Sequence, residues 1–365
     1  MTLLPGLADM HIHLRYLGNS RDNPRLLELL LANGVTTAMN LLGLPEHLTL
    51  RKEIDSGRVA GPVLYTSGFY VNEPYVRTAE QVDSVVRAQA RAGYDVVKIH
   101  GELSAPAFEA LHRAAAEMGI PVVGHAVHAL GLTALLDRHQ YAIAHTEEYL
   151  YAWFGYNRQA AIPGDSVRPL IDEAARLTAR AGTWVMPTLV VFQHIVPQIT
   201  SLDSLLASGE VKALPAAIQA EWASSANPYA NRVAYPVSVA ADFRSRAYLL
   251  SLQTLALQKA GVRLVLGTDA GVPGTTYGFS VHDELAALVA SGLTSFEALR
   301  TATSNAAAFV AGEEEFGTVQ VGRRADLLLV LGDPLVDLGV IRKPVGVMVR
   351  GQWLDRAELD RMIGH

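Results

Sequence analysis

The 365-residue chain contains no cysteine, which excludes disulfides, cysteine metal ligands and thiol catalysis. Only 18% of its residues are charged, and no run of lysine or arginine suggests a nucleic-acid or anionic-membrane surface. No apolar stretch is long enough to span a membrane, and the N-terminus lacks the features of a signal peptide. We therefore expect a cytoplasmic protein, in which any metal binds histidine, carboxylate or a modified lysine.

Apolar residues make up 50% of the chain, enough for a large core. Eight nearly continuous apolar runs are typical of parallel strands that are buried on both faces. Helical segments lie between them, and four of these end on glycine, a helix-stop signal. Eight strand–helix units in this length predict an α/β fold, a (β/α)₈ barrel over residues 5–312. The predicted strands are residues 6–13, 35–42, 62–70, 95–101, 121–124, 141–145, 183–192 and 262–269.

Beyond the barrel, residues 317–321, 325–331 and 345–350 read as short strands separated by turns. They predict a small antiparallel sheet within residues 313–356. Two long insertions, 147–169 and 193–246, follow the sixth and seventh strands at the face where barrel enzymes build their sites. The insertions form either a packed lid, or a surface excursion or contact between copies. Their aromatic residues are Trp153, Phe154, Tyr156, Trp222, Tyr229 and Tyr235.

Histidines stand at the ends of three predicted strands. His11 and His13 are two residues apart and so project to one face of the first strand. His125 ends the fifth strand and His145 the sixth. A lone histidine on an apolar strand is usually a satisfied core residue, but four at one end of a barrel favour metal ligands.

Lys98 and Asp269 are unusual residues for buried strands. Lys98 either reaches solvent or pairs with a carboxylate, or burial lowers its pKa so that the neutral amine takes up carbon dioxide as a carbamate. Asp269, at the end of the eighth strand, either caps the following segment or faces a cation.

Together these residues resemble the amidohydrolase superfamily, in particular its binuclear branch with a carbamylated lysine, which includes imidazolonepropionase-like and prolidase-like members. The resemblance runs over nearly the whole chain. The matching segments are PGLADMHIHL, VVKIHGEL, VVGHAVHALGL, YAIAHTEEY, LVLGTDAG and FGTVQVGRRADLLLVLGDPL.

The resemblance implies a binuclear metal centre in which Lys98, as a carbamate, bridges two divalent ions. It assigns His11, His13 and Asp269 to the first ion, and His125 and His145 to the second. Zn²⁺ suits this ligand set best, and Mn²⁺, Fe²⁺ or Co²⁺ are alternatives. A hydroxide between the ions would attack the substrate, and Asp269 would also shuttle its proton.

Members of the superfamily usually carry a longer segment before the first barrel strand, and that segment supplies half of a small β-sandwich. Only four residues precede Pro5 here. We therefore expect the appended sandwich to be incomplete and to expose a strand edge, unless another chain covers it. Removal of an N-terminal segment would also make a secreted or periplasmic location an alternative.

Several residues near the ligands are candidates for binding a substrate. Arg15 follows the His-x-His motif and would bind a carboxylate, unless it is a surface residue. Tyr70, His100 and His128 stand close to other strand ends. In addition, Glu147 and Glu148 follow His145, where a carboxylate can orient a ligand imidazole or remain a solvated loop charge.

The leading hypothesis is a metal-dependent hydrolase that cleaves an amide C–N bond in a small molecule such as a dipeptide or N-acyl amino acid. Alternatives are a lactonase or phosphotriesterase, a one-metal deaminase, which Lys98 disfavours, and a catalytically silent scaffold. The sequence leaves the substrate and the oligomeric state open, including a homo-oligomer.

Overall fold

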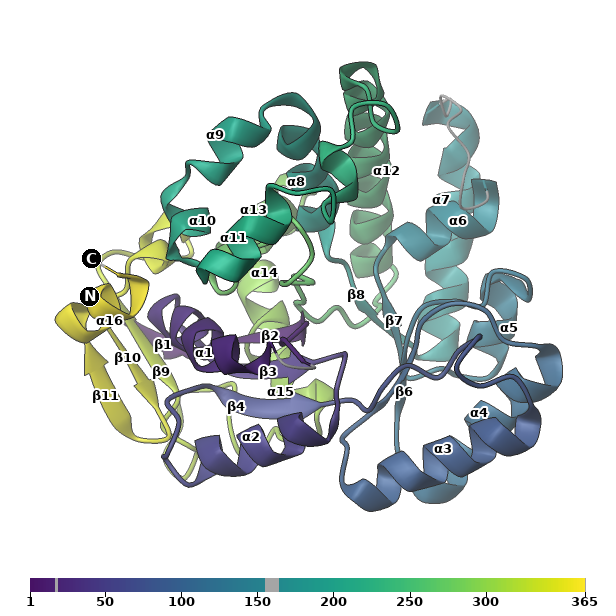
Figure 1. The fold of residues 1–365 in the computed structure, drawn as a ribbon, viewed down its shortest axis with the longest axis horizontal. Coiled ribbons are helices and arrows are strands. Elements are labelled where there is room, and N and C mark those ends of the chain that lie inside the picture. Colours follow the sequence, from purple (N-terminus) through teal and green to yellow (C-terminus); the bar gives the residue numbers. More distant parts are fainter. Residues whose placement is uncertain (17–18, 155–163, 365) are drawn as a thin grey trace.

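A computed structural model describes residues 1–16, 19–154 and 164–364, and strands and helices alternate along most of the chain (Figure 1). The strands are β1 (Thr2–Pro5), β2 (Leu7–Ile12), β3 (Val35–Asn40), β4 (Val63–Thr66), β5 (Val97–Ile99), β6 (Val122–Gly124), β7 (Ala142–Ala144), β8 (Trp184–Met186), β9 (Leu327–Val330), β10 (Gly346–Val349) and β11 (Gln352–Asp355). The α-helices are α1 (Asn23–Ala32), α2 (Pro45–Asp55), α3 (Ala79–Ala92), α4 (Ala105–Met118), α5 (Gly131–Asp137), α6 (Glu147–Phe154), α7 (Gly164–Ala181), α8 (Leu189–Thr200), α9 (Leu202–Leu206), α10 (Gly209–Ala213), α11 (Ala216–Trp222), α12 (Ala240–Lys259), α13 (Phe279–Ala290), α14 (Ser295–Thr301), α15 (Ser304–Phe309) and α16 (Arg356–Ile363). Short 3₁₀ helices are η1 (Ser20–Asp22), η2 (Pro228–Ala230), η3 (Val237–Val239) and η4 (Leu338–Arg342).

The parallel strands form two sheets whose order follows the chain, β2-β3-β4 and β5-β6-β7-β8. Because the strands are parallel and consecutive, their carboxyl ends lie at one edge of each sheet. The fold is therefore mixed α/β, as predicted. Isolated parallel bridges also join Ser67 to Val96, Val185 to Leu264 and Ile12 to Ala270.

Local sequence signals account for the helix boundaries. Helix α3 begins at a capping box, in which the Thr78 hydroxyl accepts the N–H of Gln81 and the Gln81 side chain accepts the N–H of Thr78. It ends at Gly93, whose φ of +88° is in the left-handed region that favours glycine. Helix α4 ends in the same way at Gly119. The predicted stop of these helices on glycine is confirmed.

The predicted strand 183–192 is wrong in its second half. Strand β8 ends at Met186, Thr188 adopts a left-handed φ of +51°, and helix α8 begins at Leu189. Pro187 has no N–H for a strand ladder, which explains the early end of the strand. The carboxylate of Glu284 accepts the N–H of Val190 at 2.8 Å and so satisfies a free donor in the first turn of α8.

The predicted eighth strand, residues 262–269, is an extended segment with isolated bridges and no continuous ladder. On one side the N–H of Val265 donates to the carbonyl of Val185 at 3.0 Å. On the other side the N–H of Asp269 donates to the carbonyl of His11 at 2.7 Å. The segment therefore lies between β8 and β2. Hydrogen bonds to the β2 segment continue on both sides of Asp269, which has a left-handed φ of +62°.

The small antiparallel sheet has the order β1-β9-β10-β11 and lies beside both chain ends (Figure 1). Residues 325–331 and 345–350 contribute strands, but 317–321 do not, because Gly317 has a φ of +84° and a turn follows at Gln320. The expectation that the sheet lacks an N-terminal partner also needs correction. Strand β1 pairs with β9 over its whole length, from Thr2 opposite Val330 to Pro5 opposite Leu327.

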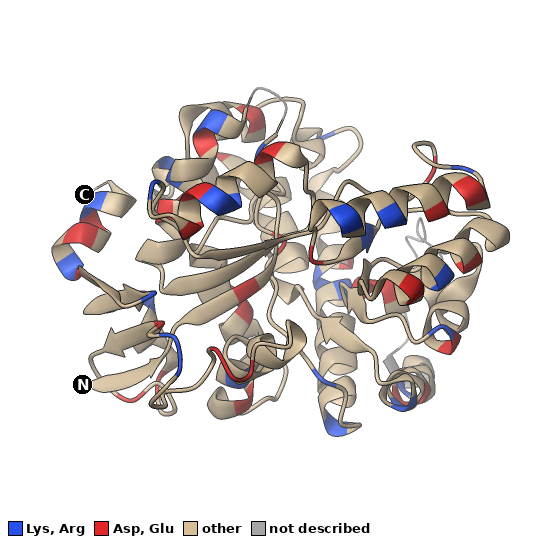
Figure 2. Ribbon diagram, turned by 90° about the horizontal axis from the view of Figure 1, so that it is seen from below, with Lys and Arg blue, Asp and Glu red and all other residues tan. Residues whose placement is uncertain are grey.

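The insertions contain helices α6 and α9–α11, the first turns of α7 and α12, and the second half of α8. Trp222 is fully buried and Trp153 packs against the core, whereas Tyr156 lies outside the described residues. Charges of both signs are interspersed, mainly on helices and loops at the outside (Figure 2). Among the described helices, none is both long and apolar enough to cross a bilayer.

Candidate metal centre

The carboxyl ends of the parallel strands bring the expected ligands together. His11 lies in β2 and His13 directly after it, Lys98 lies in β5, and His145 directly follows β7. Asp269 ends the extended segment beside β2. His11 and Lys98 are fully buried, and His145 and Asp269 are 5% and 8% exposed, so this is an interior group of polar side chains.

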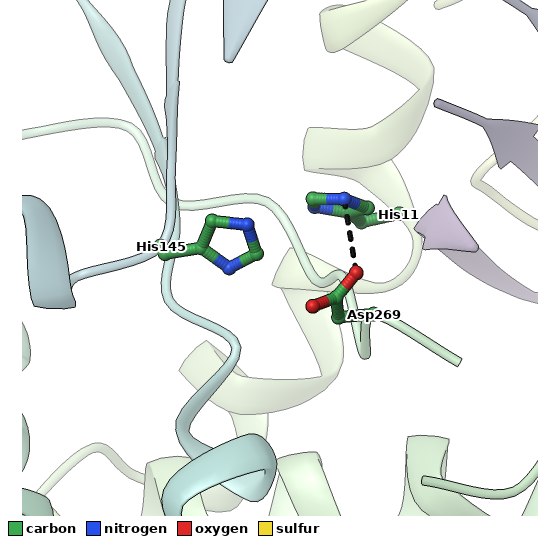
Figure 3. Close-up of side chains that lie close together, drawn as sticks. All are labelled: His11, His145 and Asp269. Atoms are coloured by element: carbon green, nitrogen blue, oxygen red, sulfur yellow. Dashed lines mark ion pairs between the residues drawn. The ribbon is translucent and has the colours of Figure 1, made fainter. Parts of the chain in front are cut away.

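His11, His145 and Asp269 form the tightest part of this group (Figure 3). One ligand atom of each lies within 4.8 Å of the others, a spacing that can hold a metal ion. The Nε2 atoms of His11 and His13 lie 3.2 and 2.8 Å from the same oxygen, Oδ1 of Asp269. The imidazole of His125 is next to that of His145, with ring centroids 4.7 Å apart.

Lys98 reaches into the same group, with its Nζ 3.4 Å from Nε2 of His11. Burial lowers the pKa of Lys98 to about 8, although the carboxylates of Asp269 and Glu148 partly oppose the shift. Near pH 7 the neutral fraction of the Lys98 amine is therefore larger than that of an exposed lysine. Burial and the neighbouring positive groups lower the pKa values of His11 and His145 well below the ordinary value, so both imidazoles are neutral.

Two of the histidines are oriented through the ring nitrogen that faces away from the group. Nδ1 of His125 donates to Glu148 at 2.7 Å, and Nδ1 of His145 lies 2.7 Å from the hydroxyl of Thr188. In each ring this leaves Nε2 for a cation, the arrangement that is usual around metal-binding histidines. His145 itself has a left-handed φ of +76°, a conformation that non-glycine residues seldom adopt outside functional sites.

A buried carboxylate fixes β2 against the segment that carries Asp269. Asp9 accepts the N–H of His11 at 3.2 Å, together with the N–H and the hydroxyl of Thr268 at 3.0 and 2.6 Å. Close packing here also requires Gly267, because a Cβ at this position would lie 2.7 Å from Cβ of His11. Asp9 was not among the predicted site residues, although an aspartate inside a strand is itself a signal.

Asp269 remains ionised despite its burial. Burial alone would raise its pKa, but the hydrogen bond from His13 and the nearby His145 and Lys98 more than offset it and lower the pKa to about 2. Its φ of +62° turns the carboxylate toward the histidines. A negative charge beside the neutral imidazoles of His11 and His145 is a suitable environment for a divalent cation.

Part of the group borders a cavity of about 1010 Å³. His13, His125, His145 and Asp269 are among its lining residues. Of the predicted substrate-binding residues, Tyr70 and His100 line the cavity, with their rings stacked at a centroid distance of 4.6 Å and an angle of 15°. His100 also makes an edge contact with His125, so this ring pair adjoins the metal-ligand candidates.

Arg15 also lines the cavity, but its charge is already partnered. Its Nη2 donates to Oε2 of Glu221 at 2.7 Å, a residue that sequence reasoning missed because it comes from helix α11, more than 200 positions away. His128 lies between Glu102 and Glu148, with nitrogen–oxygen distances of 3.3 Å to each, and is outside the described cavity lining. It lies in the segment between β6 and α5.

Sequence reasoning missed further residues that line the cavity. Four of them lie in the insertions, where only the aromatic content was a signal, and they are Tyr151, Asp242, Phe243 and Arg246. The other two are Phe192, in the first half of α8, and Tyr277, just before α13.

Comparison with known proteins agrees with this geometry. A bottromycin amidohydrolase structure has a TM-score of 0.76 at 25% identity, with 99% of this chain and 78% of that chain covered. A Xaa-Pro dipeptidase structure with bound methionine has a TM-score of 0.70 at 21% identity, with 97% and 87% covered. A 5-methylthioadenosine/S-adenosylhomocysteine deaminase from Moorella thermoacetica is 36% identical over 78 residues, which span 20% of this chain and only 18% of the deaminase. The model of the amidohydrolase family matches residues 2–354, and the chain therefore belongs to the amidohydrolase family.

Proposed function

We propose that this chain is a metal-dependent hydrolase that cleaves an amide C–N bond in a small substrate such as a dipeptide or an N-acyl amino acid. The observation that carries the proposal is the convergence of His11, His145 and Asp269, two of which, His145 and Asp269, line the cavity. Family membership supports hydrolysis, and the bottromycin amidohydrolase, which covers nearly the whole chain, supports an amide as the substrate.

The same proposal includes a barrel fold. The two parallel sheets and the segment 262–270 would close into one eight-stranded ring, since the isolated bridges lie where the sheets and this segment adjoin. Folds of the family relatives support this closure. The division into a barrel at 5–312 and an appended sheet at 313–356 stays a prediction, with β1 added to the appended sheet.

The donor set fits two divalent ions. His11, His13 and Asp269 would hold one ion, since both imidazole Nε2 atoms already face one oxygen of Asp269. His125 and His145 would hold the other ion. In each ring Nδ1 is hydrogen-bonded, to Glu148 and Thr188 respectively, and Nε2 is available as a ligand. Zn²⁺ suits these ligands best, with Mn²⁺, Fe²⁺ and Co²⁺ as alternatives. When bound, such ions would polarise the scissile carbonyl and acidify the attacking water.

Lys98 would bridge the two positions as a carbamate. Its lowered pKa leaves a larger neutral fraction of amine to attack carbon dioxide, which forms an N–C bond and releases one proton to solvent. The product is a carboxylate-type ligand in place of a cation. The proximity of Nζ to His11 supports this position for the bridge.

Asp269 would move the proton of the reaction. Its Oδ1 faces the two histidines, which leaves Oδ2 to accept a proton from the attacking water and to deliver it to the leaving nitrogen. The lowered pKa of Asp269 keeps this oxygen ionised and available as a base at neutral pH.

Metal analysis combined with a substrate panel tests the proposal. Protein purified without chelators should contain close to two divalent ions per chain and should hydrolyse amides faster than matched lactones or phosphotriesters. A reproducible metal content near zero, with no activity after addition of Zn²⁺, Mn²⁺ or Co²⁺, would instead favour a silent scaffold. Faster cleavage of lactones or phosphotriesters would be consistent with the metal centre, but it would show that an ester is the bond that is cleaved.

A further inference from the structure

Four aromatic side chains gather on one side of the cavity, and we call them the aromatic wall. They are Phe192, Tyr229, Tyr235 and Phe243, which come from α8, η2, the segment before η3 and α12. Phe243 is in ring contact with all three others, at centroid distances of 5.9, 5.9 and 6.2 Å, and the two tyrosines lie 4.9 Å apart. These rings form one continuous apolar surface.

The aromatic wall is continuous with the metal-centre candidates. Helix α8 begins next to Thr188, whose hydroxyl contacts Nδ1 of His145. Phe192 is about one turn further along, or roughly 6 Å along the helix axis. Val191 and Ile195 of the same helix also line the cavity. If the scissile bond of a substrate lies next to His145, the side chain adjoining that bond is therefore close enough to contact the aromatic wall.

The charges around the wall are balanced. The guanidinium of Arg246 donates to Asp242 at 2.9 Å on the same face of α12, and that of Arg15 donates to Glu221 at 2.7 Å. Both cavity arginines thus already have a carboxylate partner. The aromatic wall is therefore the part of the cavity lining that suits an apolar group.

We propose that the aromatic wall is a specificity site for a bulky apolar or aromatic side chain on the residue adjoining the scissile amide. Such a group buries its surface against the rings and gains edge or offset contacts with them, which a methyl group cannot do. The role of the wall in substrate selection during catalysis rests on the proposed amide hydrolysis. Binding of an apolar group at the wall does not require catalysis.

Dipeptides that differ at one residue, phenylalanine against alanine, test the proposal in the metal-loaded protein. At one of the two positions, kcat/KM should favour phenylalanine by at least about 10- to 200-fold, the range observed for a single methylene in an apolar pocket. Tyr235→Ala and Phe243→Ala should reduce this ratio at least tenfold, mainly through KM for the phenylalanine substrate. Tyr235→Phe should retain it.

Tyr248→Ala is the matched control, because Tyr248 is on the same helix as Phe243 but 61% exposed on the outside. The ratio of kcat/KM for the phenylalanine and alanine dipeptides should be the same in Tyr248→Ala as in the wild type. If the wild type cleaves dipeptides with equal kcat/KM at both positions, or Tyr235→Ala and Phe243→Ala leave the preference unchanged, the wall has no such role. If no dipeptide is cleaved, the proposed function fails, and calorimetry with N-acetylphenylalaninamide against N-acetylalaninamide decides the wall separately. Equal affinities would overturn it.

Discussion

Glu148 holds His125 by its Nδ1 at a distance of 2.7 Å, and its second oxygen accepts the N–H of Ala126 at 3.0 Å. Burial would raise the pKa of this carboxyl, but His125, His128 and the Ala126 amide more than offset it and hold the pKa well below its ordinary value. The ionised carboxylate fixes the tautomer of His125 and directs its Nε2 toward His145. Glu148 is therefore a positioning residue for the second ion of the proposed pair.

We predict that Glu148→Gln weakens metal binding and activity by about 10- to 100-fold, the usual effect of losing a carboxylate behind a histidine ligand. The amide keeps the size but accepts the imidazole proton less strongly. Titration of chelator-treated protein with Zn²⁺ measures the change. Glu102→Gln is the control, because Glu102 contacts His128 on its far side and is outside the ligand shell. Equal affinities in Glu148→Gln and wild type would contradict the assignment.

Lys98→Ala should abolish activity and remove the second ion. A short carboxylic acid such as propionate, added with bicarbonate, should restore part of both, since it can occupy the position of the carbamate. Lys98→Arg should not be rescued in this way, because a guanidinium stays protonated and forms no carbamate. Metal content and kcat/KM with and without propionate are the measurements. Full activity of Lys98→Arg would refute the bridge.

The lowered pKa of Lys98 also predicts a pH dependence of stability in the metal-free protein. Between pH 8 and 10.5 the folded lysine is neutral while the unfolded one is protonated, so the unfolded state binds more protons. The free energy of unfolding should therefore rise with pH across this window, by about 3 kcal/mol at most. Denaturant titrations in CO₂-free buffer should show this slope in the wild type and a flatter curve in Lys98→Met.

The strand-end chemistry could be predicted from sequence because it depends on local rules. Successive side chains of a strand point to opposite faces, so His11 and His13 share one face. Parallel neighbouring strands also bring their carboxyl ends to the same edge of the sheet. Histidine, lysine and aspartate in apolar strands are also rare enough to stand out. For these reasons the sequence alone indicates His11, His13, Lys98, His145 and Asp269, which the structure brings together.

Contacts made by the insertions could not be predicted, since they depend on tertiary packing between distant segments. Glu221 reaches Arg15 from helix α11, and Phe192 was assigned to a strand because an apolar run fits a buried strand and a buried helix equally well. Pro187 was the available signal for the break before that residue. The aromatic content of the insertions indicated a packed element but gave no indication of which rings face the cavity.

The pair of Arg15 and Glu221 makes a prediction about substrate charge. If Arg15 binds a substrate carboxylate, Glu221 competes with that carboxylate for the guanidinium. Glu221→Gln should then lower KM for substrates with a free carboxylate and leave their amidated analogues unchanged, while Arg15→Ala should raise KM for the former only. Equal effects on both substrate types in each variant would limit Arg15 to a structural ion pair.

Asp269→Asn removes the proposed base while it keeps the size of the side chain. We predict a loss in kcat of at least the ~10²–10⁴-fold that is typical of general acid–base groups, because the amide also is a poorer metal ligand. The lowered pKa of about 2 has a further consequence. The wild-type carboxylate is ionised throughout the range above pH 4, so the ratio of wild-type to variant kcat should be constant from pH 4 upward.

A ratio that falls steeply toward pH 5 would show that Asp269 titrates there, and that the histidines and Lys98 do not hold its charge as inferred. Asp203→Asn is the control, since Asp203 is an exposed residue of α9 and its substitution should leave kcat unchanged. Metal content must be measured beside kcat in each variant. If Asp269→Asn keeps both ions and near-normal kcat, the base is another group, and Asp269 serves only to hold His11 and His13 in place.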